Sequence, residues 1–183
     1  VANTAGYYYK PRIDLNLLIS LPGDEVVVTT ACIAGRMFKD GWEEKFLEPV
    51  HKHFGNNFYL ETQCHPDIKQ ANHNKMIMDA RHKYNIPIIH ANDSHYIYPE
   101  DAKYRDLFLK AKGIVYEEEG GFCLDYPDSD EIYRRYKEQG VLTEDEVTEA
   151  LQNTLIFDNA DGITIDKEFK IPKITEGDSN KVL

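Results

Sequence analysis

The feature that most limits the fold of this chain is a pattern repeated three times, in which a short apolar stretch precedes an amphipathic stretch of helical length. The repeats occupy residues 25–54, 58–84 and 87–112. Consecutive strand-then-helix units are typical of parallel sheets with right-handed crossovers. We therefore predict an α/β fold in which three parallel strands are each followed by a helix.

The alternation of strand and helix ends at Gly113. Residues 114–127 are acidic and punctuated by glycine, which predicts a loop with one short strand at 122–124. A helix is predicted over 130–139, and another follows it. The chain therefore changes from alternating units to a mostly helical extension.

Two helices carry recognisable N-terminal signals. Asp67 and Gln70 have the spacing of a capping box at the start of the longest predicted helix, and Thr143 and Glu146 have the same spacing at the start of the last one. His73, within the longest helix, is interpreted as a solvated residue. These signals predict where both helices begin.

Polar residues end the third apolar stretch abruptly, within the sequence PIIHANDSHYIY at 87–98. Side chains alternate along a strand, so Asp93 and His95 are expected to point the same way and Ser94 the other. A carboxylate beside an imidazole suits a divalent metal. The alternative is that Asp93 begins a turn and His95 is ordinary polar surface.

The other two predicted strands also end in residues that bear reactive groups. Cys32 follows the first strand, and Glu61 and His65 lie at the end of the second. In parallel sheets and barrels, functional residues collect at the carboxyl ends of the strands. We therefore predict a shared metal site there, with Glu61 and His65 supporting the ligands or facing a substrate. A cysteine alone could equally be a small buried hydrophobe.

Composition excludes several classes of protein. The 183 residues carry a formal net charge of −11, which is unfavourable for independent DNA binding. No apolar run approaches the length of a membrane span, so no membrane association is expected. The cysteines number three and are scattered, which favours a reducing compartment and a cytoplasmic location.

Several segments together resemble one known family. The chain is similar over roughly residues 7 to 165 to the PHP (polymerase and histidinol phosphatase) domain of bacterial or phage DNA polymerase III alpha subunits. The N-D-x-H-Y block followed by P-E-D is the most specific part of the similarity. The segments that carry it are YYYKPRIDLNLL, VVVTTACIAG, NFYLETQ, IPIIHANDSHYIYPEDA and ALQNTLIFDNAD.

This resemblance implies a distorted, TIM-like β/α barrel with metals at its mouth. Residues 1–113 would form the C-terminal part of the barrel, 114–165 its helical end, and 166–183 an extended exit segment or linker. Cys32, Asp93 and His95 fall on positions where the family has metal ligands. The metal implied by these ligands is zinc or manganese, or alternatively magnesium. The catalytic residues stay unidentified.

The family's remaining ligands lie upstream of the K-P-R-I-D block and have no counterpart in this sequence. We therefore expect a fragment of a PHP domain that is inactive alone. Its parent would be a DNA polymerase, a nucleotidyltransferase of DNA replication, with metal-dependent phosphoesterase or 3′–5′ exonuclease activity for proofreading. The alternatives are a non-catalytic scaffold that docks a proofreading subunit, and a free-standing PHP-type phosphatase, which the K-P-R-I-D block disfavours.

The partners expected from this interpretation are the remainder of the polymerase alpha subunit and, through it, DNA. A barrel without its early strands would leave apolar faces at 26–28 and 88–89 uncovered, which favours self-association. The alternative is that residues after Gly113 cover the open edge.

Overall fold

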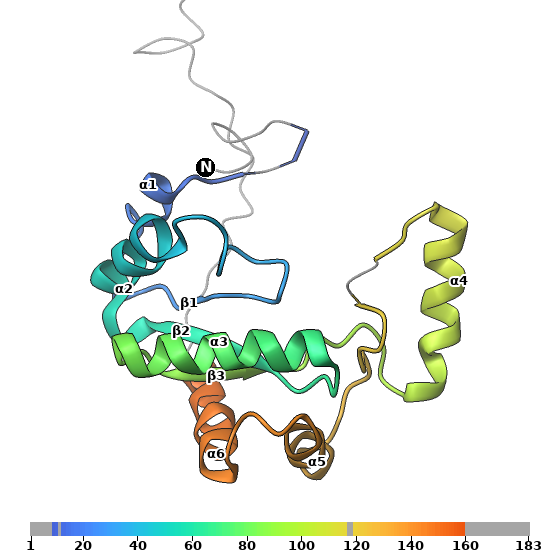
Figure 1. Ribbon diagram of the computed structural model, residues 1–183. Coiled ribbons are helices and arrows are strands. Elements are labelled where there is room, and N and C mark those ends of the chain that lie inside the picture. The colour runs from blue at the N-terminus through green and yellow to red at the C-terminus, as the bar shows by residue number, and fades with distance from the viewer. Residues whose placement is uncertain (1–8, 11, 117–118, 160–183) are drawn as a thin grey trace, which may run out of the picture.

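The computed structural model describes residues 9–10, 12–116 and 119–159. Its centre is a parallel sheet of three strands in the order β1-β2-β3, made by β1 (Val28–Thr29), β2 (Phe58–Gln63) and β3 (Ile88–Ala91). The prediction of three parallel strands, each followed by a helix, is confirmed (Figure 1). The described residues form an open sheet with helices around it, and no complete barrel is seen among them.

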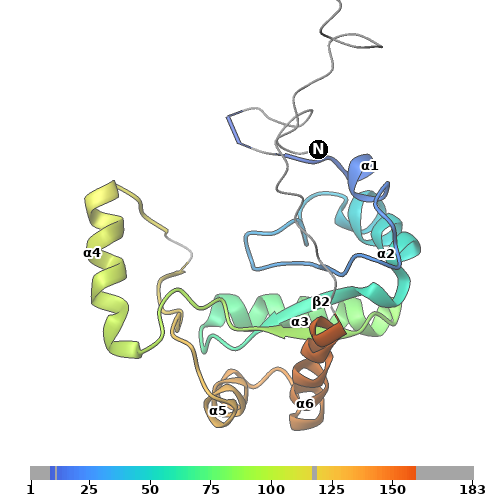
Figure 2. The same cartoon turned by 180° about the vertical axis from the view of Figure 1, so that it is seen from behind.

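The helices are distributed on both sides of this sheet (Figures 1 and 2). They are α1 (Leu15–Leu18), η1 (Glu43–Leu47), α2 (Glu48–Phe54), η2 (Gly55–Asn57), α3 (Ile68–Tyr84), η3 (Pro99–Asp101), α4 (Ala102–Lys112), α5 (Ser129–Gln139), α6 (Glu144–Asn153) and η5 (Thr154–Asn159). Five of them, η1, α2, α3, α5 and α6, contribute buried side chains to one core. None of the helices within the described ranges has the length and apolarity needed to cross a bilayer.

The core lies between the sheet and helices from both halves of the chain. Leu60 and Ile88 are paired neighbours on β2 and β3 and are fully buried. They belong to one cluster with Ile77 of α3, Tyr136 of α5 and Val147 of α6. Because α5 and α6 share this core with the sheet, the helical extension packs as part of the same unit as the strands.

The free edge of β3 is covered by α6. The Ile88 carbonyl points away from β2 and accepts a hydrogen bond of 2.7 Å from Nδ2 of Asn153. Ile88 and Ile89 are buried, so the prediction that they form an uncovered apolar face is wrong. The alternative, that residues after Gly113 cover this edge, describes the structure.

The N-terminal signals of the helices were predicted with mixed success. Thr143 and Glu146 form the predicted capping box. Asp67 caps α3 by accepting from the Lys69 amide, but Gln70 does not complete the box: its side chain is buried and its amide donates to Asn74. The Gln70 side chain therefore lies toward the next turn of α3, and not back toward its N-terminus.

His73 is buried rather than solvated as predicted. Its ring contacts the ring of Phe38 edge-on, with centroids 5.3 Å apart. Burial lowers the pKa of His73 from its ordinary value of 6.5, and the charge of Lys39 lowers it further. The loop after β1 therefore covers a stretch of α3 that the sequence pattern left exposed.

Helix α4 stands apart from the body of the molecule (Figures 1 and 2). It has no buried residue, and Leu107 and Phe108 are 67% and 59% exposed. The strand predicted at 122–124 is not formed, although Leu124 does accept hydrogen bonds from the backbone of the residues after β3. The predicted exit segment at 166–183 lies outside the described residues.

Candidate functional site

The site is built on the turn that follows β3. The strand ends at Ala91, and Asp93 adopts a left-handed conformation with φ of 53°. This conformation is uncommon for residues other than glycine, but aspartate tolerates it better than most. Asp93 and His95 were predicted to share a face through strand alternation. They lie beyond the strand, so the turn, rather than the pleat, brings them together.

The Asp93 carboxylate lies between two imidazoles. Its Oδ1 is 3.6 Å from Nε2 of His95, and its Oδ2 is 3.8 Å from Nε2 of His65. Asp93 and His95 are partly exposed, whereas the side chain of His65 is completely buried. The carboxyl ends of β2 and β3 therefore deliver an imidazole, a carboxylate and a second imidazole to one place, as the parallel topology predicts.

His65 is held firmly by its surroundings. Its ring stacks on Phe122, with centroids 4.3 Å apart and an interplanar angle of 8°. Its backbone carbonyl accepts a hydrogen bond of 2.8 Å from Nε2 of Gln139 on α5. Within the described structure, neither ring nitrogen of His65 has a hydrogen-bond partner. A buried imidazole without partners is unusual, because buried polar groups are nearly always satisfied.

The segment after Asp93 is fixed by the loop that precedes α5. The Ser94 hydroxyl donates to the Asp125 carbonyl at 2.8 Å, and the His95 amide donates to the Leu124 carbonyl at the same distance. Asp125 is buried and pairs with buried Arg135 of α5, with 2.8 Å between Oδ2 and Nη2. This connection ties the position of the site to α5.

A buried hydrogen-bonded chain lies beside the turn. Nε2 of His90 is 2.6 Å from the side-chain oxygen of Asn92, and Nδ1 is 2.8 Å from the Tyr136 hydroxyl, which also contacts Thr62 at 2.9 Å. Burial lowers the pKa of His90, although the hydrogen bond with Asn92 acts in the opposite direction. Burial raises the pKa of Tyr136 well above its ordinary value. His90 is therefore neutral at pH 7 and orients Asn92, the residue before Asp93.

Glu61 lies on the sheet but is not free to bind a metal. Its Oε2 accepts a hydrogen bond of 2.8 Å from Thr29, and its Oε1 accepts one of 3.0 Å from the side chain of Gln63. Both carboxylate oxygens are thus engaged, Oε2 with β1 and Oε1 with a neighbour on β2 itself. That Glu61 supports the ligands or faces a substrate stays a prediction.

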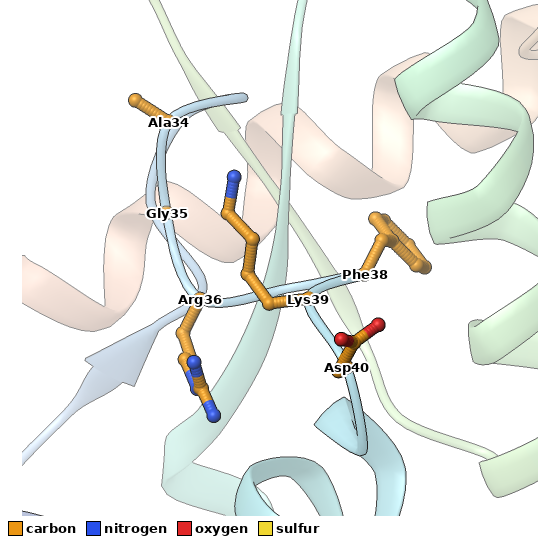
Figure 3. A pocket seen from close by; sticks show the side chains of 6 residues that line it. All are labelled: Ala34, Gly35, Arg36, Phe38, Lys39 and Asp40. Carbon is orange, nitrogen blue, oxygen red and sulfur yellow. The ribbon is translucent and has the colours of Figure 1, made fainter.

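Cys32 follows β1 at the same edge of the sheet, in a tight turn. Ala31 has a φ of 59°, and the Gly35 amide donates to the Cys32 carbonyl at 2.7 Å. Beyond it, residues 34–36 and 38–40 line an open hollow of about 850 Å³ (Figure 3). The side chains of Arg36 and Lys39 point away from one another there, so they do not converge on one anion (Figure 3).

The predicted ligands are only partly brought together. Asp93 and His95 are adjacent, but in the described part of the chain no three His, Cys, Asp or Glu side chains are close enough to hold a metal as they stand. Cys32 is therefore not assembled with Asp93 and His95. The unpartnered nitrogens of His65 beside Asp93 nevertheless fit a cation, because imidazole and carboxylate are both ligands of zinc and manganese.

Sequence reasoning underrated His65 and missed the connection through Asp125 and Arg135. The signal for His65 was its place just after a buried strand. Nothing local in the sequence shows that its ring is buried against Phe122. The Asp125–Arg135 pair had a weaker signal, an inward-facing arginine on α5.

The fold and the site define an α/β protein with a carboxylate–imidazole cluster at the carboxyl edge of a parallel sheet. No family model matches the chain. It is 31% identical over 159 residues to the DNA polymerase III subunit alpha of Borreliella burgdorferi, an alignment that includes 82% of this chain. It is 33% identical over 121 residues to the DNA polymerase III subunit alpha of Aquifex aeolicus, with 61% of this chain included.

A DNA-directed DNA polymerase of Bacillus phage SPbeta is also similar, with 25% identity over 184 residues and 88% of this chain included. The chain spans between 10% and 14% of the length of these three relatives. These similarities relate it to a small part of a DNA polymerase III alpha subunit, a protein of DNA replication.

Proposed function

We propose that this chain is the C-terminal part of a PHP domain in a polymerase of the DNA polymerase III alpha type, and that its sheet edge contributes to a metal-dependent phosphoesterase site. The observation that carries the proposal is the Asp93 carboxylate held between His65 and His95. The similarity to DNA polymerase III alpha subunits supports it. Proofreading by 3′–5′ exonuclease action is the activity proposed for the complete parent.

Asp93 and His95 would bind the metal, which we propose to be zinc or manganese. A divalent ion supplies a Lewis acid that polarises a phosphoryl oxygen and lowers the pKa of bound water. Asp93 binds in its ionised form and His95 in its neutral form. We propose Cys32 as a further ligand that joins when the turn at Ala31 moves toward the site, since a thiolate is well suited to zinc.

Zinc titration by calorimetry tests the metal site. We expect His95→Ala to weaken zinc binding by at least tenfold, whereas His82→Ala, a change at an exposed histidine of α3, should leave it unchanged. Cys32→Ser separates the role of the thiolate from that of the imidazole. Equal zinc affinity in wild type and His95→Ala would contradict the proposed site.

The isolated chain is expected to have no nuclease activity. The described residues hold too few ligands for the paired metals that in-line hydrolysis requires. Incubation with a labelled single-stranded oligonucleotide and manganese should yield no shortened product. Turnover that is lost in His95→Ala would show that the chain forms a complete site by itself.

The second candidate is a scaffold without chemistry. It is favoured by the same lack of an assembled set of three ligands within the described ranges, and by the exposed apolar side chains of α4, which are suited to contact with another protein surface. A scaffold should show no change of melting temperature on addition of zinc. A metal site should raise it, because a ligand that binds only the folded state stabilises that state.

A further inference from the structure

We infer that His65 is itself a metal ligand, and that its Nε2 and Oδ2 of Asp93 share one cation at the ends of β2 and β3. This inference rests on the proposed function. It departs from the expectation that His65 only supports the ligands or faces a substrate, and it adds a ligand from a strand that otherwise contributes none.

Among the residues that the structure describes, the buried ring of His65 lacks the hydrogen bonds that a buried imidazole normally makes. A neutral imidazole has one N–H donor and one acceptor nitrogen, and each normally finds a partner when the ring leaves water. The His65 side chain is fully buried, and neither nitrogen has a partner within the described structure. Stacking on Phe122 satisfies the faces of the ring but not its edge. The edge that carries Nε2 faces Asp93.

The distance between His65 and Asp93 suits two ligands of one cation. The separation of 3.8 Å between Nε2 of His65 and Oδ2 of Asp93 is too long for a hydrogen bond. Two ligand atoms about 2.1 Å from a tetrahedral zinc lie roughly 3.4 Å apart. The two groups therefore leave room for a cation, after a small movement of the partly exposed Asp93 side chain.

The surroundings of His65 and Asp93 also hold both groups in place. Metal-binding groups are effective when their neighbours hold them in place. Phe122 fixes the plane of the His65 ring, and Gln139 fixes its backbone carbonyl. On the other side of the carboxylate, Nε2 of His95 lies 3.6 Å from Oδ1 of Asp93. The second oxygen, Oδ2, is therefore left to His65. The carboxylate thus presents one oxygen to each imidazole, and Oδ2 is the oxygen that faces His65 and would share the cation with it.

The competing account is an ion pair in which a protonated His65 faces ionised Asp93 with no metal. The experiment that separates the two uses cobalt(II) as the probe, because its visible absorption reports the ligands around it. Wild type, His65→Gln, His95→Ala and the control His82→Ala are titrated with cobalt(II) at pH 7.5, with far-ultraviolet circular dichroism to check folding. We expect at least tenfold weaker cobalt binding in both His65→Gln and His95→Ala, and altered absorption in any complex that still forms.

The outcomes distinguish this inference from the proposed function. Wild-type affinity and spectrum in His65→Gln, with weakened binding in His95→Ala, would overturn the role of His65 and leave the proposed metal site intact. Absence of cobalt binding in wild type, or equal binding in all variants, would overturn both.

His65 is deeply buried, so His65→Gln could unfold. The wild-type chain then decides the matter by nitrogen-15 magnetic resonance. Zinc should shift the Nε2 resonance of His65, whereas an unshifted resonance in the presence of bound zinc would overturn the inference.

Discussion

Asp125 connects α5 to the turn that carries Asp93. Its side chain pairs with Arg135, and its carbonyl accepts from Ser94. Burial alone would lower the pKa of Arg135, but hydrogen bonds to Asp125 and Glu131 raise it above its ordinary value. The guanidinium is therefore charged inside the protein, where an uncompensated charge is costly.

We predict that Asp125→Asn destabilises the fold by about 3 kcal/mol, because it leaves a buried guanidinium with Glu131 as its remaining partner. Urea unfolding measures this change. Glu138→Gln is the matched control, since it breaks an exposed ion pair with Arg134 and should cost no more than about 1 kcal/mol. Equal losses of unfolding free energy in both variants would show that burial of the Asp125–Arg135 pair does not add to its contribution to stability.

The sequence predicted individual residues best where the signal was local. Asp93 and His95 could be selected because a carboxylate and an imidazole follow an apolar strand. The environment of His65 could not be predicted, because it is created by Phe122, which lies in a loop that returns from a distant part of the chain. Burial and the absence of hydrogen-bond partners are properties of the packed molecule.

At the scale of elements, α3 makes the stability of the protein dependent on pH. Burial, followed by the charge of Lys39, places the pKa of His73 below the ordinary value of 6.5. As pH falls through about 6.5, the unfolded chain binds a proton at this position before the folded chain does. The contribution of neutral His73 to the stability of the fold is therefore fully present above this pH. It is lost as the pH falls further, toward the lowered pKa of the folded state.

We predict that the melting temperature falls between pH 7.5 and pH 5.5, and that His73→Gln reduces the size of this fall. Differential scanning calorimetry at both pH values measures it. His82→Gln, a change at an exposed histidine of the same helix, should keep the wild-type slope. An unchanged slope in His73→Gln would assign the pH dependence to other groups.

The capping box of α6 allows a second prediction at this scale. The Thr143 hydroxyl accepts from the Glu146 amide, and the Glu146 carboxylate accepts from the Thr143 amide at 2.8 Å. Thr143→Ala should destabilise the protein by about 1 kcal/mol in urea unfolding. Thr143→Ser keeps the hydroxyl and should stay within a few tenths of a kcal/mol of wild type, roughly the difference between good caps. Equal loss in both would indicate that the side-chain methyl group, not the cap, stabilises α6.

The elements show where sequence patterns succeed and where they fail. The capping box of α6 and the parallel strands were predicted because their signals are contained in short stretches. β1 is limited to Val28–Thr29, because Ala31 turns the backbone into the left-handed region. Leu124 and its neighbours have the composition of a strand, but Leu124 pairs with the segment after β3 and the Phe122 amide donates to Glu119 in its own loop. In both segments the tertiary structure, and not the local sequence, determines where a strand forms.

At the scale of the whole molecule, α4 exposes more large apolar side chains than any other helix of the described residues. Tyr104, Leu107 and Phe108 are each more than half exposed. Soluble monomers rarely leave such a surface in water. We therefore place the source of self-association on α4 rather than on the predicted face at 88–89.

We predict that the wild-type chain self-associates as its concentration rises, and that the double substitution of Leu107→Lys with Phe108→Ser keeps it monomeric. Sedimentation velocity across a concentration series measures this. Lys110→Gln, an exposed polar change on the same helix, should retain the wild-type behaviour. A wild-type chain that stays monomeric throughout the series would contradict the prediction.

The hydrogen bond from Asn153 to the Ile88 carbonyl determines at which edge the sheet can accept a further strand. An outward-facing carbonyl on an edge strand is the group to which an added strand would donate. At β3 this group is already occupied by the last turn of α6, whereas β1 is a short strand at the opposite edge. A polypeptide that extends this sheet must therefore add its strand beside β1, or first displace α6 from β3.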